Sequence, residues 1–128
     1  MPRIVHVALR VRDLERVTRF YETVFGFKRV EEGQVRDHYS RHLSDGTIDL
    51  ALIQYDTGAD SAEALASSPD PCIHHFGVEV EDLDATRAQL EAAGCRVISD
   101  RGVVPIKFRD PGGVQAEIVP VGRYKQPD

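Results

Sequence analysis

An internal repeat limits how this chain can fold more than any other feature of the sequence. The segment Ile73–Val80 (IHHFGVEV) repeats the pattern of Ile4–Val11 (IVHVALRV). At an offset of 69 residues, the second copy matches the first at His75 on His6, Val80 on Val11, Asp82 on Asp13 and Leu83 on Leu14. At an offset of 68, Gly94 falls on Gly26 and Glu117 on Asp49. Each copy therefore begins with a histidine and ends with a carboxylate.

The first copy, residues 3–56, predicts a βαβββ unit. Apolar residues alternate with His6, Ala8 and Arg10 in the first strand, so the histidine lies on the face opposite the apolar one. Asp13 is a suitable N-cap for a helix that ends at Gly26. We predict further strands over 27–31, 37–43 and 47–55, with turns at 32–33 and 45–46; the last strand places Asp49 among apolar neighbours.

The second copy, residues 72–121, predicts the same order of elements. A strand from residue 72 carries His75, and a helix capped by Asp82 ends at Gly94. Three strands over 95–98, 103–109 and 114–119 complete the unit. Residues 57–71, rich in Ser, Ala, Asp and Pro, predict a linker with one helical turn around 62–66. The polar tail, 122–128, is expected to be loose.

Two βαβββ units of this kind predict an α+β domain with a shared interior. Each helix covers one face of its strands and leaves the other face bare, so the two bare faces can close toward each other. His6 and Asp49 would then approach from one half, and His75 and Glu117 from the other. The chain of 128 residues is long enough for one such domain.

Two imidazoles and two carboxylates in one cavity suit a divalent ion such as Fe, Mn, Co, Ni or Zn. The alternative is that the histidines are hydrogen-bonded interior residues and the carboxylates pair with cations. The cations available for that pairing are Arg10, Arg41, Lys107 and Arg109. The joint pattern favours a metal site, because the His–carboxylate spacing is 43 residues in one copy and 42 in the other.

Composition argues against several classes of partner. The net charge is −5 and there is no basic run, so nucleic acid is not expected. There is no apolar run of the ~20 residues that a membrane span needs. Cys72 and Cys95 form no CxxC pair, which is typical of a cytoplasmic protein with reduced thiols, although Cys72 could line the same cavity as His75.

Three segments carry a family resemblance: HVALRVRDLERVTRFYETVFGF, HHFGVEVEDLDATRAQLEAAG and FRDPGGVQAEI. They resemble the vicinal oxygen chelate superfamily, which includes glyoxalase I, methylmalonyl-CoA epimerase, extradiol dioxygenases, and fosfomycin and bleomycin resistance proteins. The resemblance implies two tandem βαβββ modules forming a half-open barrel, and commonly a homodimer. It also implies metal positions at His6, Asp49, His75 and Glu117. His74 would point toward the helix or support its neighbour.

Asp49 departs from the family pattern, because glyoxalase I has a glutamate at this position. Aspartate is one methylene shorter, so its carboxylate would fall short by roughly 1.5 Å. If Asp49 reaches the ion, the resemblance implies a four-ligand site of the lyase or epimerase type. If it does not, His6, His75 and Glu117 form a 2-His-1-carboxylate triad, the arrangement of Fe(II) oxygenases.

The first functional hypothesis is a metal-dependent lyase or isomerase resembling glyoxalase I. A small substrate with vicinal oxygens would chelate the ion, the metal would stabilise an enediolate, and Glu117 or Asp49 would carry the proton. Arg10, Lys107 or Arg109 could bind a carboxylate or phosphate of that substrate.

Two other hypotheses remain. An extradiol-type Fe(II) dioxygenase would use His38, His42 or Tyr39 as additional acid–base groups. A non-catalytic binding protein of the bleomycin-resistance type would use aromatic walls in place of metal ligands. The chain has no Trp and keeps four residues of ligand type, so we rank this hypothesis third.

Overall fold

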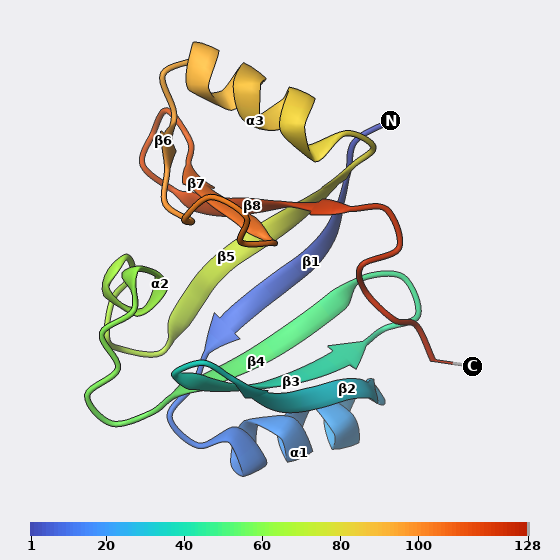
Figure 1. Cartoon of the computed structure of the whole chain (residues 1–128). Helices are drawn as coiled ribbons and strands as arrows, with labels where there is room; N and C mark the ends of the chain where they lie inside the picture. The colour runs from blue at the N-terminus through green and yellow to red at the C-terminus, as the bar shows by residue number, and fades with distance from the viewer. Residues whose placement is uncertain (128) are drawn as a thin grey trace.

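Eight strands form one continuous sheet in the computed structural model, which describes residues 1–127 (Figure 1). The order across the sheet is β2-β3-β4-β1-β5-β8-β7-β6. The sheet curves and stays open at one side, so the predicted α+β fold of two βαβββ modules in a half-open barrel is confirmed. The strands are β1 Arg3–Arg10, β2 Lys28–Val35, β3 His38–Ser44, β4 Asp49–Tyr55, β5 Cys72–Val80, β6 Arg96–Val97, β7 Ile106–Arg109 and β8 Gln115–Pro120.

The two longer helices, α1 and α3, lie on the outer side of the sheet, one for each half (Figure 1). α1 (Leu14–Phe25) begins after Asp13, whose side chain accepts a hydrogen bond from the Arg16 amide, and ends at Gly26 with a φ of 72°. α3 (Leu83–Ala92) begins after Asp82 in the same way. The short helix α2 (Ala62–Leu65) occupies the linker. No helix within residues 1–127 is long and apolar enough to cross a membrane.

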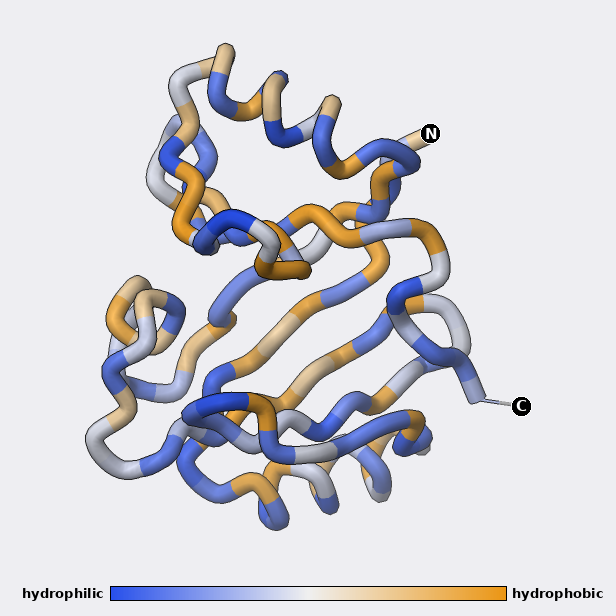
Figure 2. Tube along the Cα trace, viewed as in Figure 1, coloured by the Kyte–Doolittle hydropathy of each residue, from blue (hydrophilic) through white to orange (hydrophobic). Residues whose placement is uncertain are grey.

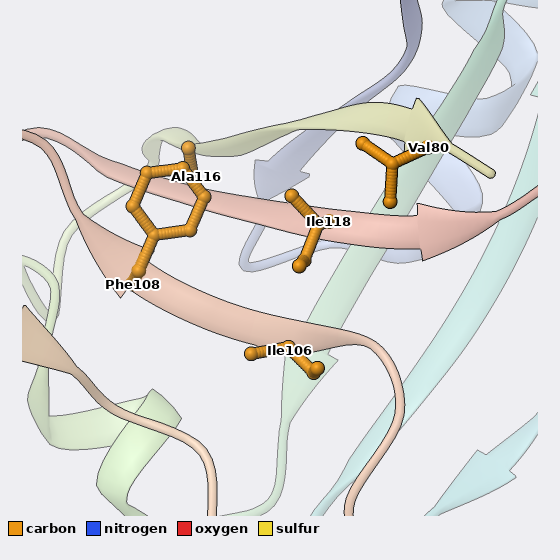
Figure 3. Close-up of a cluster of buried hydrophobic side chains, with 5 residues drawn as sticks. All are labelled: Val80, Ile106, Phe108, Ala116 and Ile118. Carbon is orange, nitrogen blue, oxygen red and sulfur yellow. The ribbon is translucent and has the colours of Figure 1, made fainter. Parts of the chain in front are cut away.

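The apolar side chains pack between each helix and its strands. Figure 2 shows apolar and polar residues alternating along the central strands. One cluster lies against α1 and contains Val11, Leu14, Leu43 and Leu52. The other lies in the second half and contains Val80, Ile106, Phe108, Ala116 and Ile118 (Figure 3). A third, smaller cluster of Ala8, Ala51 and Ile53 lies on the concave face, beside the polar side chains of the cavity.

The two halves meet where β1 pairs with β5 in antiparallel orientation at the centre of the sheet. On its other side β1 pairs with β4 in parallel, with His6 opposite Asp49. β5 pairs with β8 in parallel, with Gly77 opposite Glu117. The strands that carry the four candidate ligands are thus adjacent: β4, β1, β5 and β8.

Two local predictions were wrong. β2 continues through Gly33, which pairs with Ser40, and the turn falls at residues 36–37, where Arg36 adopts a φ of 51°. Because Gly33 fits the strand ladder, the glycine signal for a turn was overridden by pairing along the whole hairpin. In the second half, β6 and β7 are shorter than the ranges 95–98 and 103–109 that we predicted.

Arg41 joins α1 to the sheet. This residue is 5% exposed, and its guanidinium donates hydrogen bonds to Thr18 Oγ1 (3.0 Å), Glu15 Oε1 (2.9 Å) and Glu32 Oε1 (3.0 Å). These contacts raise the pKa of Arg41 above its ordinary value, and the hydrogen bond that Arg41 donates to Glu15 is the largest cause. The group therefore stays charged and links α1, β2 and β3.

We expect Arg41→Met to lower the free energy of unfolding by about 1–3 kcal/mol, because several hydrogen bonds to one buried group are lost together. The matched control is Arg29→Met, which removes a more exposed ion pair with Glu22 (2.9 Å) and should cost less than about 1 kcal/mol. Urea denaturation of both variants measures the difference. Equal losses would contradict this role for Arg41.

Candidate metal centre

Three buried donor atoms meet on the concave face, from β1, β5 and β8. His6 Nε2 lies 3.1 Å from His75 Nε2, and His75 Nε2 lies 2.6 Å from Glu117 Oε1. Each of the three residues is less than 5% exposed. Two imidazole nitrogens and a carboxylate oxygen therefore face one another within 4.8 Å, a donor set that suits a divalent ion of the Fe, Co, Ni or Zn type.

Gly77 makes room for this group of side chains. It lies opposite His6 on one side and Glu117 on the other. A Cβ at this position would lie 3.1 Å from His6 Cβ and 3.3 Å from Glu117 Cγ, closer than ordinary van der Waals contact. The absence of a side chain lets both donors approach the same point. The sequence placed Gly77 on the His75 face but gave no signal of this role.

Asp49 lies beside the same histidine but contacts its other ring nitrogen. Its Oδ2 is 2.6 Å from His6 Nδ1, whereas Nε2 of His6 is the atom that faces His75. The carboxylate also contacts His42 Nδ1 at 2.8 and 3.0 Å. His6, His42 and Asp49 thus form a second group of possible donors. The repeat could not reveal His42, because its match in the second copy is not a histidine.

His74 supports its neighbour His75, which is one of the two roles predicted for it, and also contacts helix α2. Its Nδ1 lies 2.6 Å from His75 Nδ1, and its Nε2 lies 3.2 Å from the carbonyl oxygen of Glu63. Burial lowers the pKa of His74 to about 3, so the ring is neutral at pH 7. Each histidine of the group therefore has its Nδ1 held by a neighbour, Asp49 for His6 and His74 for His75, as is usual for metal-ligating histidines.

The protonation states match what metal binding requires. Burial raises the pKa of Glu117, but the charge of Lys107 and the contact with His75 outweigh it and bring that pKa well below the ordinary value. Burial also lowers the pKa of His75, although Glu117 acts in the opposite direction. Burial alone would raise the pKa of Asp49. Hydrogen bonds from His42 and His6 have the larger effect, so the pKa of Asp49 lies below its ordinary value. Carboxylates are thus ionised and His75 is neutral.

A cavity of about 120 Å³ opens beside the three donor atoms. Its walls include the rings of His38, His42, Tyr55 and Tyr124. Lys107, 6% exposed, also lines it and places Nζ 3.3 Å from Glu117 Oε1.

The other two predicted substrate cations point elsewhere. Arg10 donates hydrogen bonds to Ala64 O (3.0 Å) and Ser67 Oγ (3.3 Å), and Arg109 donates to Gly113 O (2.8 Å). Arg10 therefore stabilises the linker, and Arg109 stabilises the turn before β8. Cys72 lines a neighbouring hollow that also touches His75, and it is not part of the cavity wall described above.

The tail is packed against the site, so the prediction that it is loose was wrong for residues 122–126. The Tyr124 ring stacks on His6, with centroids 4.3 Å apart and planes 10° apart, and its hydroxyl donates to Glu117 Oε2 at 2.7 Å. Figure 1 shows this segment leaving the end of β8 and passing toward the other half of the sheet. Asp128 lies outside the described residues. Composition gave no signal of these contacts, because they are made across the fold.

Comparison with known proteins identifies the family. The model of the Glyoxalase/Bleomycin resistance protein/Dioxygenase superfamily matches residues 3–118. The chain belongs to this superfamily. The family resemblance seen in the sequence is therefore confirmed, and the matched range covers nearly the whole sheet.

Relatives within the superfamily include both lyases and epimerases. An ethylmalonyl-CoA/methylmalonyl-CoA epimerase of Cereibacter sphaeroides is 32% identical over 75% of this chain and 74% of its own length. A lactoylglutathione lyase of Haemophilus influenzae is 28% identical over 91% and 90%. A probable chloroplastic lactoylglutathione lyase of Arabidopsis thaliana is 26% identical, and this chain spans 37% of its length.

Solved structures of the superfamily share the fold. The methylmalonyl-CoA epimerase of Mycobacterium tuberculosis superposes with a TM-score of 0.73 and 25% identity, covering 91% of this chain and 86% of that one. Together these likenesses support an enzyme of the superfamily.

We expect Gly77→Ala to disturb the donor group specifically. The added methyl group must push His6 and Glu117 apart by a few tenths of an ångström, at a cost of about 1–3 kcal/mol of unfolding free energy. Gly33→Ala is the control, because a Cβ there meets nothing within 4 Å. Thermal denaturation and metal content of both variants test this. A Gly77→Ala protein as stable as the Gly33→Ala protein would contradict it.

We also expect His38 to make stability depend on pH. Burial lowers its pKa, whereas the unfolded chain binds the proton near the ordinary value of ~6.5. The stability that the neutral ring contributes is thus present above pH ~6.5 and is lost as the pH falls below it. His38→Gln should therefore lose less unfolding free energy than the wild type between pH 7.5 and 5.5 in urea titrations. Identical losses would show that His38 is not responsible.

Proposed function

We propose that this protein is a divalent-metal-dependent lyase or epimerase whose ion is held by His6, His75 and Glu117. The observation that carries the proposal is the convergence of His6 Nε2, His75 Nε2 and Glu117 Oε1 in a buried cluster at the cavity. Fe, Mn, Co, Ni and Zn all accept such a donor set. Three protein donors leave positions for two adjacent oxygens of a small substrate.

In this proposal Asp49 orients His6 and is not a ligand itself. Its contact with Nδ1 at 2.6 Å supports this assignment, because a carboxylate there fixes the ring tautomer that leaves Nε2 free to bind. The shorter side chain, compared with the glutamate of glyoxalase I, fits the same role. The proposed site then corresponds to the second of the two outcomes that the sequence left open, in which Asp49 does not reach the ion.

The bound ion would act as a Lewis acid and ease removal of a proton beside a substrate carbonyl. The two carboxylates expected to carry that proton are both engaged: Asp49 with two imidazoles, and Glu117 with His75 and Tyr124. His42 is better placed, because its ring lines the cavity and its Nδ1 faces Asp49, which would orient it. We therefore propose His42 as the proton carrier, with Asp49 behind it.

Lys107 is proposed to bind negative charge on the substrate. It is the cation nearest the donor atoms, it is buried, and it lines the cavity beside Glu117 Oε1. A buried ammonium is a strong partner for an oxyanion, because solvent does not screen it. Of the three cations that the sequence offered, Lys107 is the one whose position supports this role.

Metal analysis of the purified protein tests the site directly. We expect His75→Ala to reduce the bound metal to roughly a tenth of the wild-type content or less, because a ligand is lost rather than a supporting group. His38→Ala is the matched control: it removes another imidazole from the same cavity and should keep its metal. A His75→Ala protein with full metal content would rule out the site. Lactoylglutathione lyase and methylmalonyl-CoA epimerase assays on the loaded protein would then separate the two reactions.

An extradiol-type Fe(II) dioxygenase is the second candidate. The position of Asp49 at Nδ1 of His6 favours it, since a 2-His-1-carboxylate triad is typical of Fe(II) oxygenases. His38 and His42 line the cavity, whereas Tyr39 donates to Glu32 elsewhere. Oxygen uptake with catechols and Fe(II) would favour this candidate over the first.

The homodimer and the cytoplasmic location that the sequence analysis predicted stay predictions.

A further inference from the structure

The C-terminal segment Gly122–Gln126 runs from the end of β8 toward the connection between β3 and β4 and is hydrogen-bonded at both ends (Figure 1). At its start, the Gly122 amide donates to Glu79 Oε2 at 3.1 Å. At its end, Gln126 Oε1 accepts a hydrogen bond from Ser44 Oγ at 2.6 Å. The segment therefore joins the strand that carries Glu117 to the half of the sheet that carries Asp49.

Tyr124, which lies between these two hydrogen bonds, gives the two carboxylate oxygens of Glu117 different partners. Its hydroxyl donates to Oε2 at 2.7 Å, whereas Oε1 faces His75 Nε2 at 2.6 Å and Lys107 Nζ at 3.3 Å. A buried carboxylate with one oxygen held by a hydrogen-bond donor keeps one orientation. That orientation presents a single oxygen to the point where the imidazole nitrogens meet.

The ring of Tyr124 also limits the movement of His6. It lies nearly parallel to the imidazole, at a centroid distance of 4.3 Å, while Asp49 holds Nδ1 and Nε2 faces His75. One residue of the tail thus contacts two of the three proposed ligands, one through its hydroxyl and one through its ring face. These contacts come from a segment outside both repeated units.

We infer that Tyr124 is a positioning residue of the metal centre and that the segment Gly122–Gln126 is required for the full metal affinity of this chain. The inference rests on the proposed function, since it concerns the same three ligands. In chemical terms, the phenol holds Oε2 of Glu117 and would leave Oε1 for the ion, and the stacked ring would keep His6 in the orientation in which Nε2 faces His75. Supporting groups of this kind typically change metal affinity by about 10–100-fold.

Titration of the protein with Co²⁺ after removal of bound metal tests the inference, with the visible absorption spectrum of the bound ion as readout. Tyr124→Phe keeps the ring and removes the hydroxyl, so we expect affinity to fall about 10-fold and the spectrum to shift as Glu117 changes its coordination. Tyr124→Ala should lower affinity further. Gln126→Ala, which loosens the anchor without touching a ligand, should give a smaller loss.

Tyr39→Phe is the matched control, because it removes another tyrosine hydroxyl that donates to a glutamate, Glu32, away from the cavity. We expect wild-type affinity and spectrum from it. A Tyr124→Phe protein with wild-type affinity and an unchanged spectrum would overturn this inference and leave the proposed function intact. Failure of the wild-type chain to bind Co²⁺ would overturn both.

Discussion

The antiparallel pairing of β1 with β5 is the contact on which the rest of the site depends. It joins the two repeated units and makes neighbours of two histidines that are 69 residues apart in the chain. Each of these strands pairs in parallel with a strand carrying a carboxylate, so four functional groups arrive on four adjacent strands. This arrangement requires a glycine at position 77, because the Cβ of any other residue would come too close to His6 and Glu117.

The buried polar groups of the site stabilise one another through a defined order of hydrogen bonds. If His75 offers its Nε2 to an ion, its proton lies on Nδ1 and is donated to His74 Nδ1. The proton of His74 then lies on Nε2, facing the carbonyl oxygen of Glu63. On the other side, Asp49 holds the proton of His6 on Nδ1 in the same way. Burial of so many polar groups is tolerable because they satisfy one another, and it fixes the tautomers that metal binding needs.

The fold and the proposed donor triad do not determine which reaction is catalysed, since the superfamily relatives include both lyases and epimerases. In this proposal the choice lies with the groups around the triad. His42 and Lys107 would decide where a proton and a negative charge can be accommodated in the cavity. Tyr124 closes the same region from the tail, so the proposed chemistry draws on a segment that the repeat does not include.

The sequence by itself determined the repeated βαβββ unit and the strand positions of His6 and His75, because alternation and helix caps are local signals that survive in each copy. It also identified the two carboxylates through their matched spacing. Only the tertiary structure decided that Asp49 faces Nδ1 of its histidine and that Tyr124 reaches Glu117. These outcomes depend on distances between strands and on a tail that folds back over the sheet. Contacts of this kind, between residues far apart in the chain, produce no periodic pattern in the sequence.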